Sequence, residues 1–192
     1  MVQRIFKAVA VAASFGLLAA SISVSTPVQA HVAPAPCDFV TGGGFVFKDN
    51  GERINYGVHG GCKNGEFWGH VNFVDHENQF HFNSTRITGY VWDPAMPNSR
   101  DICGWGRINT QEQEVMFRFR VVDNGEPGRS GPDQAGIMID NWFTSGERFY
   151  RATLRDISGG NLQLHKGNKS NTLEPGFFSL QEWQMCGDMP TP

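Results

Sequence analysis

The sequence lacks the short motifs that identify the most common enzyme classes. It contains no GxSxG turn, no HExxH segment and no P-loop, and none of its four cysteines belongs to a CxxC pair. The first three absences remove the usual evidence for a serine hydrolase, a zinc protease or a nucleotide hydrolase. The fourth argues against a structural zinc site or a redox-active dithiol. We therefore assign no catalytic residue and expect a binding or structural protein.

Long apolar runs are missing as well, except for one near the start of the chain at residues 8–24. Arg4 and Lys7 precede this run, and a small-x-small tripeptide that ends at Ala30 follows it, which is the pattern of a cleaved secretory signal peptide. No later run has the length of a membrane span. We expect cleavage after Ala30, no transmembrane anchor, and a secreted or periplasmic protein.

Positive charge is also scarce. The chain carries 16 basic and 19 acidic residues, and the two basic residues at positions 1–30 would leave with the signal peptide. The exported part then has 14 basic and 19 acidic residues and a net charge of −5. This balance argues against a nucleic acid or an anionic membrane as the partner.

Alanine and leucine become rare after residue 36, whereas the whole chain has 23 glycines, 15 phenylalanines and 5 tryptophans. This composition disfavours long helices and suits short strands joined by tight turns. Alternation of polar and apolar residues, or β-rich composition, predicts strands at about 39–47, 54–59, 66–75, 79–92, 102–110, 115–123, 135–143, 148–155 and 160–165. We therefore expect an all-β fold, a single-domain antiparallel sandwich or barrel of about nine strands.

The predicted β domain covers residues 39–167. Residues 31–38 are rich in proline and are expected to form a flexible lead-in. Residues 168–192 would form a C-terminal tail that is tied to the domain by Cys186.

The four cysteines all lie in the exported part, where an even number predicts two disulfides. Three pairings are open. We favour Cys37–Cys186, which would tie the two tails together, with Cys62–Cys103 joining segments inside the sheet.

Residues 66–83 predict a hairpin with two different faces. A four-residue loop at 75–78 would place Phe73 opposite Phe80 on an apolar inner face. The outer face would then carry two imidazoles and two amides, from His70, Asn72, His81 and Asn83. In this register His70 and His81 are diagonal neighbours, close enough to share a ligand or a metal ion.

Five short strings occur in an informative order. They are Val40-Thr41-Gly42-Gly43-Gly44, GHVNFVDH at 69–76, the segment 81–85, DNGEPG at 123–128 and GGNLQLHK at 159–166. Together they resemble the post-COAP-1 family, exported bacterial domains with a VTGGG start and a GGN-x-Q-x-H end. The resemblance implies a compact β domain outside the cytoplasm, with no attributed activity. The chain departs from the family pattern by an insertion at 129–134 and by its cysteine-bearing tail.

Two sets of side chains could bind a cation. The first set could supply imidazoles to a divalent metal ion such as zinc or copper, and consists of His70, His76, His81 and His165, with His59 as an alternative to His76. The second set offers oxygens to calcium from a Gly/Pro-rich connection, and consists of Asp123, Glu126 and Asp133. Each has a simpler alternative, because hairpin histidines commonly make surface hydrogen bonds and the DNG string is a turn sequence.

Aromatic rings on the strands are a third candidate. Trp105 lies between two glycines, which would leave a ring face open to stack on a sugar. The predicted ligand-binding residues are His70, Asn72, His81, Asn83 and Trp105. We expect an exported, non-catalytic module with a binding or structural role, and a polysaccharide or another cell-envelope component as its partner. The alternative is a metal-dependent hydrolase or metal-binding protein that uses the His70/His81 face.

Overall fold

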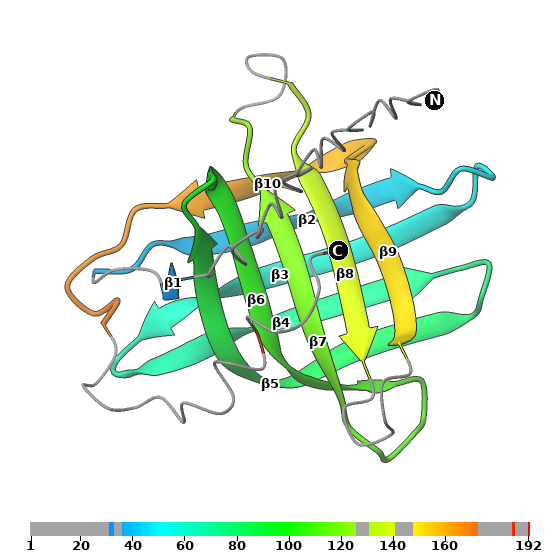
Figure 1. Cartoon of the computed structure of the whole chain (residues 1–192), viewed down its shortest axis with the longest axis horizontal. Helices are drawn as coiled ribbons and strands as arrows, with labels where there is room; N and C mark the ends of the chain where they lie inside the picture. Colours follow the sequence, from blue (N-terminus) through cyan, green and yellow to red (C-terminus); the bar gives the residue numbers. More distant parts are fainter. Residues whose placement is uncertain (1–30, 33–35, 126–130, 141–147, 173–185, 187–191) are drawn as a thin grey trace, which may run out of the picture.

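The computed structural model describes residues 31–32, 36–125, 131–140, 148–172, 186 and 192. These residues form an all-β fold in which nine antiparallel strands make one curled sheet, in the order β10-β2-β3-β4-β5-β6-β7-β8-β9 (Figure 1). A short tenth strand, β1, pairs with β5 beside this path. The strands are β1 (His31–Val32), β2 (Phe39–Phe47), β3 (Arg53–Lys63), β4 (Glu66–Asp75), β5 (Phe80–Asp93), β6 (Met96–Ile108), β7 (Val115–Val122), β8 (Gln134–Asp140), β9 (Arg148–Asp156) and β10 (Gly159–His165). Within the described part of the chain, a helix long and apolar enough to cross a membrane is not found.

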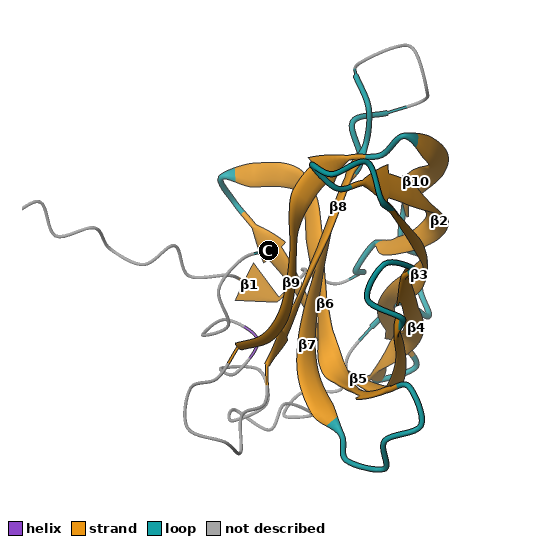
Figure 2. Ribbon diagram, turned by 90° about the vertical axis from the view of Figure 1, so that its right-hand side faces the viewer, coloured by secondary structure: helices purple, strands orange, loops and turns teal. Residues whose placement is uncertain are grey.

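The sheet folds back on itself at β5 and β6, so that two layers face each other (Figure 2). We call β10, β2, β3, β4 and the first half of β5 layer 1, and the remainder of the sheet layer 2. The pairing of β5 with β6 shifts register between Ser84 and Arg86, between Ile87 and Gly89, and between Val91 and Asp93. Such bulges increase strand twist and bend. They allow one continuous sheet to supply both layers, whose strands cross at a steep angle in Figure 1.

The core lies between the two layers and consists of alternate residues from each strand. Its largest fully buried side chains include Phe73, Phe82, Tyr90, Phe117, Phe119, Ile102 and Ile137. The rings of Phe82 and Phe117 meet across the layers with centroids 5.0 Å apart. Burial of each such side chain stabilises the fold by about 1.5–3 kcal/mol. The predicted all-β architecture is therefore confirmed.

The two glycine-rich strings, VTGGG and GGNLQLH, pair with each other. Gly160 lies opposite Gly44, and Asn161 lies opposite Gly43, in the ladder between β10 and β2. Gly160 has a φ of +104°, and a Cβ there would lie 2.1 Å from the carbonyl oxygen of Gly43. A side chain is excluded at this position both by the backbone conformation and by the close approach of β2.

The free edge of β10 is covered by two carboxylates from the connection between β7 and β8. The backbone N–H of Leu162 donates to Asp133 Oδ2 at 2.8 Å, and that of Leu164 donates to Asp123 Oδ2 at 2.7 Å. These bonds satisfy donors that an open sheet edge would leave available to another strand. They also hold the end of layer 1 against layer 2.

The register of the β4–β5 hairpin differs from the prediction. Asp75 pairs with Phe80 and Phe73 pairs with Phe82, so the loop is 76–79 and not 75–78. The difference amounts to two residues, which is one full period of a strand, so every side chain keeps its predicted face. Phe73 and Phe82 are buried, whereas His81 is exposed.

The favoured disulfide pairing is wrong. Cys37 is bonded to Cys62, and Cys103 is bonded to Cys186. Cys62 belongs to the core cluster, whereas Cys103 lies in a separate cluster with Val91 and Cys186. Cys62 therefore faces the core, on the inner side of layer 2, whereas Cys103 lies on the outer side of that layer. A sequence pattern cannot reveal this separation, because it depends on how the sheet curls.

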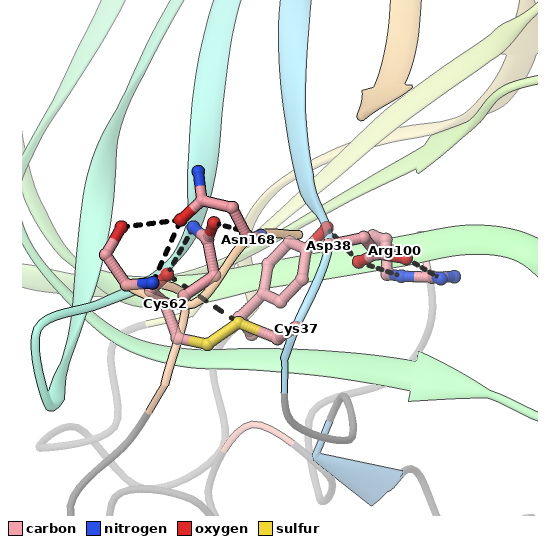
Figure 3. Close-up of a disulfide and its surroundings, with 8 residues drawn as sticks. Cys37, Asp38, Cys62, Arg100 and Asn168 are labelled. Atoms are coloured by element: carbon pink, nitrogen blue, oxygen red, sulfur yellow. Dashed lines mark hydrogen bonds and ion pairs between the residues drawn. A yellow bond between two sulfur atoms is a disulfide. The ribbon is translucent and has the colours of Figure 1, made fainter. Parts of the chain in front are cut away.

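The Cys37–Cys62 disulfide ties the segment just before β2 to the end of β3 (Figure 3). Asn171 fastens the same corner, because its carbonyl oxygen accepts from Cys37 N at 2.8 Å and its Nδ2 donates to Cys62 O at 2.9 Å. Beside it, Arg100 makes an ion pair with Asp38. The expected lead-in thus includes residues that the fold holds, since His31 and Val32 also pair with Trp92 and Val91. The predicted signal peptide lies outside the described residues.

Candidate ligand-binding face

The outer face of layer 1 carries three aligned rows of side chains. Strand alternation and the observed register place them across β10, β2, β3, β4 and β5. The first row is His165, Phe39, Gly61 and Trp68; the second is Gln163, Thr41, His59 and His70; the third is Asn161, Gly43, Gly57, Asn72 and Asn83. The face therefore combines rings, imidazoles and amides, and these rows contain no charged carboxylate or ammonium group.

Five rings from the first and second of these rows form a continuous path, which we call the ring row. His165 stacks on Phe39 with ring centroids 4.6 Å apart and an interplanar angle of 16°. Phe39 lies 6.0 Å from Trp68, and Trp68 lies 5.6 Å from His59. His59 lies 6.2 Å from His70. Aromatic pairs attract at such distances, so each ring helps to fix the orientation of the next.

Glycine at position 61 makes the ring row possible. Phe39 and Trp68 pair with Gly61 from opposite sides, and a Cβ on Gly61 would lie 2.6 Å from the Cβ of Phe39. In the third row, a Cβ on Gly57 would meet no atom within 4 Å. The surface beside the rings is therefore low and open.

Three of the predicted ligand-binding residues form a hydrogen-bonded group, the amide cluster. Asn72 Nδ2 donates to Asn83 Oδ1 at 2.6 Å and lies 2.9 Å from His81 Nε2. Asn83 Nδ2 approaches the same Nε2 at 3.0 Å. Both amide nitrogens are donors, so they can share the lone pair of Nε2 when that nitrogen carries no proton. The three side chains thus hold one another in place.

His70 lies apart from His81. In the observed register His81 is opposite Val74, four residues along β4 from His70, a distance of about 13 Å at the rise of a strand. His70 Nδ1 instead lies 3.2 Å from Ser84 Oγ. The expected diagonal contact between His70 and His81 is therefore wrong, because it depended on the hairpin register.

The remaining histidines of the predicted metal set have separate partners. His76 Nε2 lies 3.1 Å from Asn55 Nδ2, and His165 Nε2 lies 2.7 Å from Thr41 Oγ1. Among the residues that the structure describes, no group of three or more His, Cys, Asp or Glu side chains is placed to hold a metal ion. His59, which the sequence offers as an alternative to His76, is the imidazole that lies directly opposite His70.

The pKa of His59 is lowered from its ordinary value. Partial burial disfavours the charged ring, and the nearby imidazole of His70 adds a smaller repulsion. His59 is therefore neutral at physiological pH, with a ring that can accept a hydrogen bond, stack or bind a metal.

The two described residues of the predicted calcium set accept hydrogen bonds from backbone N–H groups. Asp133 Oδ1 accepts from Asn124 N at 2.9 Å and Asp123 Oδ1 accepts from Gly125 N at 2.8 Å. Their second oxygens accept from β10, as described above. Glu126 lies outside the described residues. All four carboxylate oxygens of the two aspartates thus accept a backbone N–H.

Trp105 does not contribute an open ring. Its side chain is 7% exposed and packs with Met116 and Met138, and the guanidinium of Arg86 lies 5.1 Å from the ring centroid. The expectation of a free stacking face at this position is wrong. The flanking glycines allow close approach of neighbouring strands, since a Cβ on Gly104 would lie 2.1 Å from Arg86 O.

A cavity of about 410 Å³ opens where β9 approaches the β2–β3 and β4–β5 hairpins. Four of its charged side chains form two ion pairs. Asp75, which is fully buried, accepts from Lys48 Nζ at 2.7 Å and from the hydroxyl of Tyr150 at 2.8 Å. Arg155 pairs with Asp49 at 2.7 Å. These contacts join the edge of layer 2 to layer 1, and they account for the polar residues here as elements of the fold.

Comparison with known proteins adds no relative, because no protein-family model, curated protein or solved structure matches the chain. The argument about a ligand therefore depends on the outer face of layer 1.

Proposed function

We propose that this chain is an exported, non-catalytic module that binds a polysaccharide on the outer face of layer 1. The ring row carries this proposal. Its rings lie side by side on a rigid sheet, and hydrogen-bonding groups flank them. Sugars present apolar C–H faces and equatorial hydroxyls, so aromatic rings and neighbouring amides are suitable partners for them.

The charges of this surface fit a neutral polymer. The three rows carry amides, a threonine hydroxyl and imidazoles, and His59 is neutral at physiological pH. The amide cluster continues the ring row toward β5, and its donors and acceptors are oriented by their mutual bonds. A chain of sugars lying across the strands could contact the rings first and the amides next.

Export is supported by two disulfides, Cys37–Cys62 and Cys103–Cys186, because such bonds persist in oxidising compartments. The signal-peptide pattern that ends at Ala30 and the resemblance to the post-COAP-1 family support the same location. We infer a secreted or periplasmic protein. The alternative of a metal-dependent hydrolase at His70 and His81 has less support, since the two rings are held apart.

The experiment measures retention of the protein on insoluble cellulose, chitin and peptidoglycan sacculi, and its retardation in gels that contain soluble glucans. We expect Trp68→Ala to weaken binding about tenfold, as removal of one stacking ring should, and Trp68→Phe to restore part of the loss. Phe47→Ala is the matched control, because Phe47 is 46% exposed at the far end of β2.

No retention of the wild-type protein on any of these polymers would overturn the proposal. Equal losses in Trp68→Ala and Phe47→Ala would overturn it as well, because they would indicate general adsorption through apolar surface.

A further inference from the structure

His59 and His70 form a cross-strand pair at the centre of the outer face of layer 1. They are register partners in the ladder between β3 and β4, and their ring centroids lie 6.2 Å apart with an interplanar angle of 38°. Side chains at such positions leave the sheet from Cβ atoms about 4.5–5.5 Å apart. Both rings therefore project into the same small volume above the sheet.

The hydrogen bonds of the pair leave nitrogen lone pairs available. Ser84 Oγ accepts from Val71 N at 2.8 Å and lies 3.2 Å from His70 Nδ1. A hydroxyl oxygen has two lone pairs, so Ser84 can also accept an Nδ1–H from His70. The Nε2 atom of His70 then keeps a lone pair that can bind a metal ion. Neither ring nitrogen of His59 makes a hydrogen bond within the part of the chain that the structure describes.

The surroundings of the pair are neutral and open. Thr41 lies opposite His59 on the side of β2, and Trp68 and Asn72 flank His70 along β4. Gly57 precedes His59 on the same face, and a Cβ there would meet no atom within 4 Å. His59 itself is exposed. A bound ion would thus have access from solvent and room for water ligands, and the flanking positions present no positive charge to oppose it.

We propose that His59 and His70 together bind a divalent transition metal ion of the zinc or nickel class, with water molecules completing its coordination. Zinc bonds imidazole nitrogen at about 2.0–2.1 Å, so two rings on one ion have centroids about 5 Å apart. The observed separation of 6.2 Å requires the rings to approach by about 1 Å, which small side-chain rotations supply. Ser84 would orient His70, as polar partners commonly do for metal-bound histidines.

This site differs from the one that the sequence predicts. It joins His70 to His59, which the sequence offers only as an alternative to His76, whereas His76, His81 and His165 have the separate partners described above. It also goes beyond polysaccharide binding and does not require it, because the rings of Phe39 and Trp68 would remain available beside the ion.

The test is a calorimetric titration of the EDTA-treated protein with zinc chloride near pH 7.5, together with NMR of the protein labelled with ¹⁵N-histidine. We expect one zinc ion per chain and a coordination shift confined to ring nitrogens of His59 and His70. Loss of an outer partner of a metal ligand weakens metal binding roughly tenfold to hundredfold. His59→Gln and His70→Gln each remove a ligand itself, so each should weaken zinc binding by more than that. His76→Gln and His81→Gln are the controls and should bind like the wild type.

Absence of zinc-dependent heat, or a shift on other histidines, would overturn the site. The polysaccharide assay repeated in EDTA separates the two proposals, because retention without metal would support the module whether or not the site exists.

Discussion

The outer faces of the two layers begin from the same sequence pattern and end in different environments. In layer 1, alternation places His81 and Asn83 on an outer face that solvent reaches, and His81 is exposed. In layer 2, the same alternation along β7 places Arg118 and Arg120 outward, yet these side chains are only 4% and 5% exposed. Alternation thus predicts which residues share a face, but it does not predict whether that face meets water.

Contacts from the end of the chain account for the difference. Cys186 is bonded to Cys103 on β6, its carbonyl oxygen accepts from Arg118 Nη1 at 3.2 Å, and it is fully buried. Pro192 lies against β8, since a Cβ on Gly136 would lie 2.9 Å from its side chain. Both residues are remote in sequence from the strands they contact. The disulfide fixes one of them on the outer face of layer 2.

Charges enclosed in this way need partners. Asp101 supplies them: its Oδ1 accepts from Arg120 Nε at 2.7 Å, and its Oδ2 accepts from Arg118 at 2.6 Å and from Arg120 Nη2 at 2.7 Å. Asp93 adds a longer contact to Arg120 at 3.4 Å. A buried carboxylate shared between two guanidinium groups is stable only as a complete set. The exposed polar groups on the outer face of layer 1 have no such requirement, because water can replace any missing partner.

The largest effect that the comparison predicts is in layer 2. Asp101→Asn leaves two buried guanidinium groups without their main counter-charge, and we expect a loss of about 3–5 kcal/mol in the free energy of unfolding. Urea denaturation followed by tryptophan fluorescence measures it. Asp156→Asn on exposed β9 is the control and should change stability by less than about 0.5 kcal/mol. A loss below about 1 kcal/mol for Asp101→Asn would contradict the requirement for a complete set.

An intermediate effect is expected for Asp75, the buried carboxylate of layer 1. Burial alone would raise its pKa, but hydrogen bonds from Lys48, Tyr150 and Asn78 outweigh burial and leave the pKa lowered. Stability from a lowered carboxyl pKa is fully present above the ordinary value near 3.8 and is lost as the pH falls through the lower folded value. We expect Asp75→Asn to cost about 1–3 kcal/mol at pH 7.

The difference between wild type and Asp75→Asn should shrink as the pH is lowered below 4. Unfolding curves at several pH values measure this dependence. A difference that stays constant from pH 7 to pH 3 would show that the carboxylate charge does not contribute, and that the side chain acts only by its shape.

The smallest effect should come from the amide cluster. Asn72→Ala removes two contacts that water can replace at a partly exposed position, and we expect a change within about 0.5 kcal/mol. The same substitution should clearly reduce retention on polysaccharide, although it hardly changes the free energy of unfolding, because the amide faces the proposed ligand. A stability loss comparable to that of Asp101→Asn would remove the distinction between the two faces.

Much of the fold could be predicted from local pattern. The nine expected strands match β2 to β10, with the largest differences at the end of β3 and the start of β6. The expected end of the strand at 135–143 lies outside the described residues. The face of each hairpin residue was also predictable, because a register error of two residues preserves it. Exact register was not, since Asp75 is held at the hairpin end by contacts with Lys48 and Tyr150, which are far from it in sequence.

The candidate site was only partly predictable. His70, Asn72, His81 and Asn83 do occupy one outer face. Phe39 and Thr41 were missed, and His59 was offered only as an alternative to His76, because these residues reach that face only through the pairing of β2 and β3 with their neighbours. The one signal that could have found them was the VTGGG string, whose glycines imply close contact with another strand. Trp105 was misplaced because flanking glycines indicate close packing as readily as an open ring.

The amino-acid sequence by itself determined where the strands lie and which of their residues share a face, because these depend on interactions between neighbouring residues. It also determined where glycine allows two backbones to approach closely. The tertiary structure alone decided which cysteines bond, which outer face is covered and which imidazole lies opposite His70. Those outcomes depend on how the sheet curls at β5 and β6, and on contacts between residues that are distant in the chain.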